Sequence, residues 1–276
     1  MIVKKMKNYG ELTANYVSGS KSPWLITSWH AKGISTGTAL LVLPPFYEEM
    51  NCCRRLFSSL AWQLTIEGID TYLPDFYGTG DSSGDFSEIS LDLWRRDLLM
   101  WLPTLSKYRE VHLLGCRLGA ALLLDWLVDF KQEVSVGKLL LWQPTLQVDR
   151  FWQQLTRQSK FSKNGTLSSK YLEVAGYIIP ILLRAELGNL NTTLPSEIKD
   201  VLWLESSLNG SLNTAALNAL KLNPNLDIRR ITCAPYWLTQ EVIDTDDLIP
   251  ASLSFLTEPL PKNESNISNL CKVVLG

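Results

Sequence analysis

Short apolar runs alternate with longer segments of helical periodicity through the first 145 residues. The apolar runs predict strands at Ala39–Leu43, Ile69–Leu73, Val111–Leu114 and Lys138–Trp142. Between them, apolar residues recur at helical spacing and predict helices at Asn51–Glu67, Leu91–Ser106 and Leu118–Phe130. Buried strands that alternate with such helices are typical of a mostly parallel sheet with helices on both faces. The predicted fold class is therefore α/β.

The pattern changes after this alternating half. From Gln147 to about Asp200, polar stretches alternate with an aromatic and aliphatic segment, Tyr171–Leu187, which predicts a mainly helical insertion over one end of the sheet. Strands are expected again at Val201–Leu204 and Ile228–Thr232, and Pro250–Gly276 is expected to be a loosely packed tail. We therefore expect a single domain over residues 1–276, with a cap insertion at about residues 147–200.

Charge and hydropathy argue against a nucleic-acid partner and against a membrane-spanning segment. The 276 residues include 26 Lys and Arg against 28 Asp and Glu, a net charge of −2. Nucleic-acid binding leaves a strong basic excess, so we expect no nucleic-acid partner. No apolar run reaches the ~20 residues of a membrane span, and the first residues lack the apolar core of a signal peptide. We expect no transmembrane segment and a cytoplasmic location.

Cysteines and histidines limit the metal and redox chemistry. The cysteines are odd in number and form no C-x-x-C pair, which predicts reduced thiols; they are Cys52, Cys53, Cys116, Cys233 and Cys271. His30 is expected in a strand ahead of the sheet and His112 in a central strand, both in structural roles. Two imidazoles are too few for a multi-histidine metal centre. We expect no metal and no cofactor.

The motif L-L-G-C-R-L-G-A, residues 113–120, lies at a junction of strand, tight turn and helix. Gly-x-nucleophile-x-Gly at such a junction is the nucleophile elbow of α/β-hydrolases, where the glycines allow helix and strand to pass closely. Here the central residue is Arg117. Because an arginine stays protonated in proteins, it cannot attack a carbonyl.

Two further motifs follow predicted strands. D-F-Y-G-T-G-D-S-S-G, residues 75–84, is similar to a loop after the fourth strand of many α/β-hydrolases, where its role is chiefly structural. L-P-P-F-Y-E-E-M-N-C-C-R-R, residues 43–55, occupies the turn where that fold places an oxyanion-hole amide. Glu48 and Glu49 suit a first helical turn, and either is expected to form a buried ion pair with Arg117.

The order of these motifs resembles one family. P-P-F-x-E-E-M-N-x-x-R-R, D-x-x-G-x-G-D-S-S-G and G-x-R-L-G-A together resemble the exosortase A system-associated hydrolases of Gram-negative bacteria. L-W-Q-P at 141–144, E-V-A-G-Y at 173–177 and P-Y-W-x-x-Q-E at 235–241 are similar to the second of its two types. The resemblance covers roughly residues 35–250. It implies the α/β-hydrolase fold and a role in envelope or matrix production, because such proteins are encoded beside exopolysaccharide and exosortase/PEP-CTERM sorting genes. Proteins of that system are the implied partners.

An acyl-transfer triad needs a nucleophile, a base that titrates near neutrality and an acid that orients the base. In this fold they occur in the order nucleophile, acid, then histidine after the last strand. Glu205 follows a predicted strand at the acid position, but no histidine lies downstream of Arg117. Two of the three roles are therefore empty, and a missing base alone costs about 10²–10⁴-fold in rate.

Three hypotheses remain for a pocket at the carboxyl edge of the sheet under the insertion. The first is hydrolysis or acyl transfer on a small-molecule, lipid-related or glycan-related intermediate, with catalytic candidates Arg117, Glu205 and Glu48. The alternative is a catalytically inactive homologue that binds a partner or an anionic ligand, with Arg117 as the anion anchor. A thioesterase acting through Cys116 is least favoured, because that side chain is expected to point away from the elbow apex. The candidate binding residues are Phe46, Tyr47, Glu49, Asn51, Arg54, Cys116 and Trp237.

Overall fold

A computed structural model describes residues 10–33, 35–161, 167–195, 198, 200–208, 212–223, 226–239, 241 and 247–258. Within these ranges, eight strands form one mixed sheet in the order β1-β2-β4-β3-β5-β6-β9-β10. Their bounds are β1 Gly10–Val17, β2 Trp24–Ala31, β3 Thr38–Leu43, β4 Ile69–Asp75, β5 Glu110–Cys116, β6 Val136–Trp142, β9 Val201–Ser206 and β10 Asp227–Ile231. The six strands from β4 to β10 in this order run parallel.

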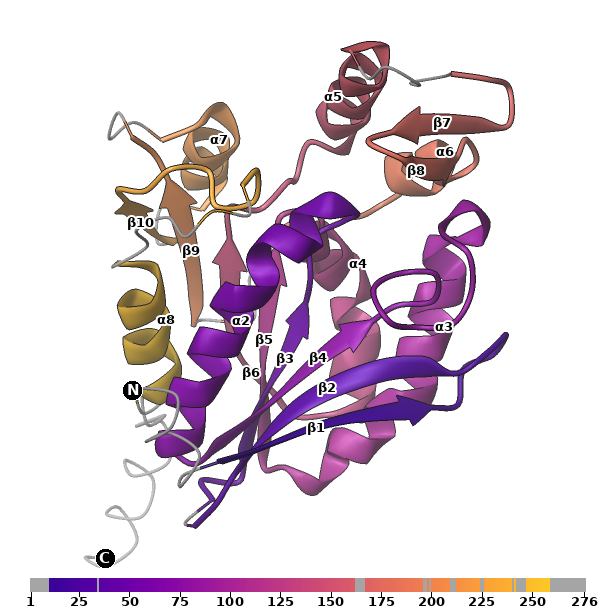
Figure 1. Cartoon of the computed structure of the whole chain (residues 1–276). Coiled ribbons are helices and arrows are strands. Elements are labelled where there is room, and N and C mark those ends of the chain that lie inside the picture. The colour runs from indigo at the N-terminus through magenta and orange to yellow at the C-terminus, as the bar shows by residue number, and fades with distance from the viewer. Residues whose placement is uncertain are drawn as a thin grey trace, which may run out of the picture.

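Helices cover both faces of the sheet, as the pattern predicted (Figure 1). Helices α2 (Glu48–Ile66) and α8 (Leu248–Thr257) pack on one face, and α3 (Leu91–Trp101) and α4 (Leu118–Glu133) on the other. Successive residues of β3 alternate between the two cores: Leu41 and Leu43 face α4, whereas Leu40 and Val42 face α2. Burial on both faces explains why the central strands are continuous apolar runs.

The amino-terminal hairpin corrects one expectation. His30 lies inside the sheet, in β2, and not ahead of it. Strands β1 and β2 pair antiparallel with each other, and β2 pairs antiparallel with β4 at the edge of the parallel strands. Because β1 is mostly exposed, it lacks the apolar run that marked the other strands.

Two further boundaries also differ from the prediction. Pro250 lies inside helix α8, which buries Leu248, Ile249 and Phe255 against the sheet, so the expectation of a loose tail from Pro250 is wrong for residues up to 258. Proline is tolerated there because it lies in the first helical turn. Residues 259–276, with Cys271, lie outside the described residues. The helix expected to end at Ser106 ends at Trp101 and continues as a 3-10 helix, η2 (Leu102–Lys107), with Pro103 near its start.

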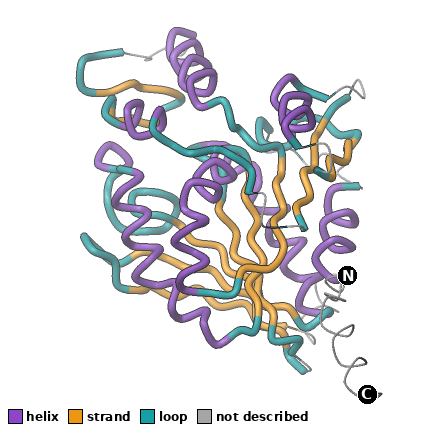
Figure 2. Tube along the Cα trace, turned by 180° about the vertical axis from the view of Figure 1, so that it is seen from behind, coloured by secondary structure: helices purple, strands orange, loops and turns teal. Residues whose placement is uncertain are grey.

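The connection between β6 and β9 lies beyond the carboxyl ends of the strands (Figures 1 and 2). It contains α5 (Val148–Phe161), β7 (Tyr171–Val174), β8 (Tyr177–Pro180) and α6 (Leu183–Gly188). The expectation of a mainly helical segment missed the β7-β8 hairpin. Its two-residue loop, Ala175-Gly176, has φ of 51° and 84°, which suits the tight turn of a hairpin. Residues 162–166, 196, 197 and 199 of this connection lie outside the described residues.

Hydrogen bonds hold this connection to the sheet and its helices. The Tyr47 hydroxyl donates to Gln158 Oε1 at 3.0 Å, and the Leu91 amide donates to Glu186 Oε2 at 2.8 Å. The remaining helix, α7 (Thr214–Leu222), precedes β10, and a short 3-10 helix, η1 (Phe86–Glu88), contacts β8. Among the described helices, none combines the length and apolar character needed to cross a membrane.

Candidate functional site

The elbow predicted between β5 and α4 is present, with Arg117 at its apex. Arg117 has φ 54° and ψ −121°, a strained conformation for a residue with a side chain. A Cβ on Gly115 would lie 2.5 Å from the Ala120 Cα, and one on Gly119 would lie 2.2 Å from the Leu43 oxygen. Both glycines are therefore required by the close passage of helix and strand.

The Arg117 side chain forms a two-pronged ion pair with Glu49. Nε donates to Glu49 Oε2 at 3.2 Å and Nη2 donates to Oε1 at 3.0 Å. Arg117 is 9% exposed and Glu49 is 2% exposed. The guanidinium carbon also lies 4.5 Å from the centre of the Trp237 ring, a cation–π contact. Of the two acids that the sequence offered as partners, the structure places Glu49 against the arginine.

The surroundings shift the pKa of both partners. Burial works against the charged guanidinium, but the nearby Glu49 charge and its hydrogen bonds prevail, so the pKa of Arg117 is raised. Burial raises the pKa of the Glu49 carboxyl, and contact with Arg117 offsets part of that effect. The arginine is therefore charged at all ordinary pH values and cannot act as a nucleophile or a base.

The turn after β3 leaves almost no space beside the elbow. Tyr47 also has a positive φ, 46°, and brings the turn against the start of α4. The cavity at this place has a volume of about 10 Å³ and is lined by Phe46, Tyr47 and Met50 from one side and by Leu118 and Gly119 from the other. This is about the room that a single water needs. In α/β-hydrolases the oxyanion-binding amides belong to this turn and to the residue after the elbow apex.

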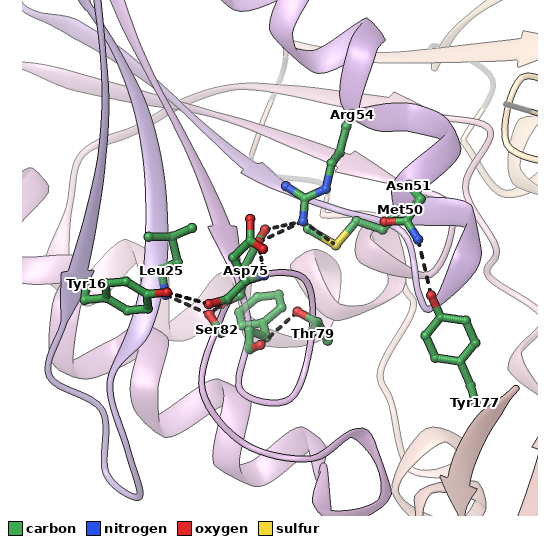
Figure 3. Close-up of polar contacts among 11 residues, drawn as sticks. Tyr16, Leu25, Met50, Asn51, Arg54, Asp75, Thr79, Ser82 and Tyr177 are labelled. Carbon is green, nitrogen blue, oxygen red and sulfur yellow. Dashed lines mark hydrogen bonds and ion pairs between the residues drawn. The ribbon is translucent and has the colours of Figure 1, made fainter. Parts of the chain in front are cut away.

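Glu48 and Asn51 link α2 to the β7-β8 hairpin. Glu48 Oε2 accepts hydrogen bonds from Asn51 Nδ2 and from the Tyr177 hydroxyl, each at 3.0 Å. Figure 3 shows Asn51 directed at the Tyr177 hydroxyl, 3.2 Å away. Next to them, burial raises the pKa of the Tyr47 hydroxyl to about 12. The polar residues at the start of α2 thus hold the connection in place, and Glu48 does so next to Glu49, which binds Arg117.

Arg54 points away from the elbow. Its Nη2 donates to both carboxylate oxygens of Asp75, at 2.8 Å each, and Asp75 also accepts from the Asp81 amide at 2.9 Å (Figure 3). Asp75 is 1% exposed, and a Cβ on Gly80 would lie 2.0 Å from its Oδ2. The Asp75–Gly84 loop is therefore closed around the end of β4, and Arg54 supports that loop.

Glu205 lies at the carboxyl end of β9, the position expected for a triad acid. It accepts hydrogen bonds from Gln143 Nε2 at 3.0 Å and from Trp203 Nε1 at 2.9 Å, and it is 1% exposed. Burial raises its pKa against the effect of these donors. Gln143 has a positive φ, 43°, and its Oε1 accepts from the Ser206 amide at 2.6 Å. The carboxyl group is therefore enclosed by partners of its own.

Cys116 and the histidines complete the sequence candidates. Cys116 is fully buried on the α2 face and contacts Cys53, whose pKa burial raises well above its usual value. His112 lies five residues before Arg117 on β5, roughly 16 Å along the strand. His30 lies on β2, three strands from β5, and its ring contacts Asp70 at 3.1 Å. These are the only two histidines of the chain, so no imidazole reaches the apex.

Two glutamines of this region were not predicted from the sequence. Gln143 follows β6 and Gln158 lies on α5, and each binds a candidate residue, Glu205 and Tyr47 respectively. The position of Gln143 just after a parallel strand was a usable signal, whereas Gln158 had none. Within the described residues, no group of three His, Cys, Asp or Glu side chains could hold a metal ion.

Comparison of the structure with known proteins identifies the fold. Est1E from Butyrivibrio proteoclasticus has a TM-score of 0.63 at 11% identity, over 88% of this chain and 97% of its own. An α/β serine hydrolase without lid from Xanthomonas campestris has a TM-score of 0.57 at 14% identity, over 89% and 94%. A Pyrococcus furiosus esterase has a TM-score of 0.51 at 15% identity, over 82% and 83%. No family model matches the sequence, and no curated protein is similar to it. The chain has the α/β-hydrolase fold, which confirms the predicted fold class.

Proposed function

We propose that this α/β-hydrolase-fold chain is a noncatalytic member of the exosortase-linked envelope system that its motifs resemble, and that it acts by binding. The observation that supports this most is the buried Arg117–Glu49 pair at the elbow apex. In an acyl-transfer enzyme of this fold, the apex side chain attacks the substrate and a histidine takes its proton. Here the apex carries a guanidinium that is already bound, and both imidazoles lie elsewhere.

The filled cavity beside the elbow supports the same proposal. Catalysis of acyl transfer needs a place where the backbone amides can hold the developing oxyanion. The cavity between the turn after β3 and the start of α4 has a volume of about 10 Å³, which is about the room that one water needs. The pair also argues against Arg117 as an anion anchor, because Glu49 neutralises its charge and occupies two of its donors. An incoming carboxylate or phosphate would have to displace a buried acid. We therefore propose that the elbow neither carries out acyl transfer nor binds an anion through Arg117.

The test is a turnover assay on the full chain with matched variants. Wild type, Arg117→Ala and Arg117→Ser would be offered p-nitrophenyl esters, thioesters and a fluorophosphonate probe that labels activated serines. We expect rates at the level of buffer and no labelling for all three proteins. Turnover by wild type that Arg117→Ala abolishes would overturn the proposal, provided that circular dichroism shows both proteins to be folded at the assay temperature.

A second candidate is hydrolysis in which a carboxylate activates water directly. Glu205 is the candidate base, because it lies at the carboxyl edge of the sheet and burial raises its pKa. Gln143 and Trp203 would have to release the carboxyl group before it could bind water. The carboxylate would take a proton from water while the water oxygen attacks an ester or thioester carbonyl. Under this candidate Glu205→Gln removes turnover while Arg117→Ala spares it, so the same assay separates the two functions.

The link to envelope production needs a genetic readout. A strain that lacks the gene would be complemented with wild type or with the apolar replacement Glu49→Leu/Arg117→Met, and exopolysaccharide would be measured. A noncatalytic role predicts full complementation by the double variant, because the fold is kept. Loss of complementation by a folded double variant would contradict it, and an unchanged exopolysaccharide level in the deletion strain would remove the envelope link.

A further inference from the structure

The connection between β6 and β9 differs in charge from the rest of the chain. Residues 148–188 hold six Lys and Arg against three Asp and Glu, whereas the whole chain has a net charge of −2. One of the three acids, Glu186, is occupied by the Leu91 amide. The connection is therefore a basic element mounted on an acidic body, and it forms the outer end of the molecule beyond the strands (Figure 1).

Three of these cations surround one cleft. Arg157 and Lys160 lie a turn apart on α5, and Arg184 faces them from α6. The cleft has a volume of about 560 Å³. All three residues are exposed, and none of their side chains forms an ion pair or hydrogen bond with another described residue. Unpaired cations around one concave surface give it a positive potential that attracts an anionic group.

Apolar residues also line the cleft, and two exposed apolar residues follow lining residues in the chain. Trp152, which is 5% exposed, and Ile181 are among the lining residues. Leu167 lines the cleft and is 56% exposed. Phe161 follows Lys160 at the end of α5 and is 90% exposed, and Leu182 follows Ile181 and is 77% exposed. Large apolar side chains that are exposed next to a cleft are typical of interaction surfaces.

We call the exposed cations of the cleft and the exposed apolar residues next to them the basic cleft surface: Arg157, Lys160, Arg184, Phe161, Leu167 and Leu182. We propose that the basic cleft surface docks on a bilayer that contains anionic phospholipids, with a head-group phosphate in the cleft. Cations next to exposed aromatic and aliphatic side chains are the pattern of interfacial membrane binding, in which charge attracts the lipid surface and apolar groups enter it. The guanidinium groups suit a phosphodiester. A soluble phosphorylated ligand would use the cations but leave Phe161 and Leu182 in water, which is why the bilayer is favoured. This inference is independent of whether the elbow is catalytic.

The experiment is co-sedimentation of the full chain with vesicles. Vesicles of phosphatidylcholine with phosphatidylglycerol would be compared with pure phosphatidylcholine. We expect binding to the anionic vesicles alone, and a loss of affinity on the order of 100-fold in Arg157→Gln/Lys160→Gln/Arg184→Gln, from about fivefold per cation. A matched control, Lys32→Gln/Lys107→Gln/Lys221→Gln, changes the net charge equally elsewhere on the surface and should bind like wild type.

Further experiments distinguish a lipid bilayer from a soluble phosphorylated ligand. Phe161→Ser/Leu182→Ser should weaken vesicle binding while the charge is unchanged, and free glycerol phosphate should not displace the protein from vesicles. Binding should fall as the ionic strength rises from about 0.1 M to about 1 M, because the Debye length shrinks from about 10 Å to about 3 Å. Equal binding to neutral vesicles, or wild-type affinity in the folded triple variant, would overturn the proposal. So would binding of glycerol phosphate by a protein that ignores vesicles, since the occupant would then be a soluble phosphorylated ligand.

Discussion

Replacing the two members of the Arg117–Glu49 pair singly and together measures how the elbow is held. The single variants are Glu49→Leu and Arg117→Met, and the double variant carries both. Methionine at position 117 keeps a long side chain under Trp237 and leaves the backbone strain at φ 54° in place. Each single change therefore removes a charge and its hydrogen bonds but little of the volume.

The burial of the pair sets the expected magnitude. Glu49 is 2% exposed and Arg117 9%, so a lone survivor would be a charge in a nearly dry site. Breaking a buried pair from one side costs about 3–5 kcal/mol, whereas replacing both members by apolar residues is often neutral or stabilising. We expect each single variant to lose about 3 kcal/mol of unfolding free energy and the double variant to stay within about 1 kcal/mol of wild type.

The assay is urea unfolding followed by circular dichroism, with the coupling energy taken from the four proteins. A surface pair supplies the control: Arg229 Nη2 lies 2.8 Å from Asp227 Oδ2, but the two side chains are 44% and 46% exposed. The double-mutant cycle of this pair, with Arg229→Gln and Asp227→Asn, should give a coupling energy of at most about 1 kcal/mol. If the losses of the Arg117 and Glu49 variants simply add in the double variant, the two groups are not coupled and the account of the apex is wrong.

Three other changes test other parts of the structure. Burial, helped by the charge of Lys138, lowers the pKa of His112 from 6.5 to about 4, so the unfolded chain takes up a proton before the folded one does. The neutral His112 therefore adds about 3 kcal/mol to the free energy of unfolding above pH 6.5, and this contribution is lost as the pH falls to about 4. In His112→Asn, the free energy of unfolding should depend less steeply on pH between 6.5 and about 4. A pH dependence as steep as that of wild type would refute the assignment. Gly119→Ala places a Cβ 2.2 Å from the Leu43 oxygen and should cost at least about 2 kcal/mol in thermal or urea unfolding; a wild-type midpoint would contradict the close passage at the elbow. Arg117→Ser should not create an esterase, because no imidazole lies near residue 117; measurable p-nitrophenyl ester turnover by this variant would show a base that the geometry does not reveal.

Local steric rules made the elbow predictable from the sequence. Glycines at 115 and 119 around a strand–helix junction are needed wherever a helix leaves a strand so tightly, and the structure shows both in close contact. The alternation of apolar runs and helical segments likewise predicted the central strands and α2, α3 and α4, since burial on both faces leaves a clear trace in the sequence. The β1-β2 hairpin and α8 left weaker traces, because one is mostly exposed and the other follows a loop and contains a proline.

The sequence by itself determined that an arginine occupies the apex, that no histidine follows it and that the fold is α/β. It did not determine which acid meets the arginine, because Glu48 and Glu49 are neighbours that differ only in their direction around α2. The packing of Leu56 and Phe57 against the sheet sets the rotation of that helix, and this turns Glu49 inward to Arg117 and Glu48 toward Tyr177. Only the tertiary structure brought Arg54 to Asp75 and placed Arg184 of α6 across one cleft from Arg157 and Lys160 of α5, since these residues come from separate elements. Spacing along the sequence carries the information on local conformation, whereas the partners of a charged side chain depend on how whole elements pack.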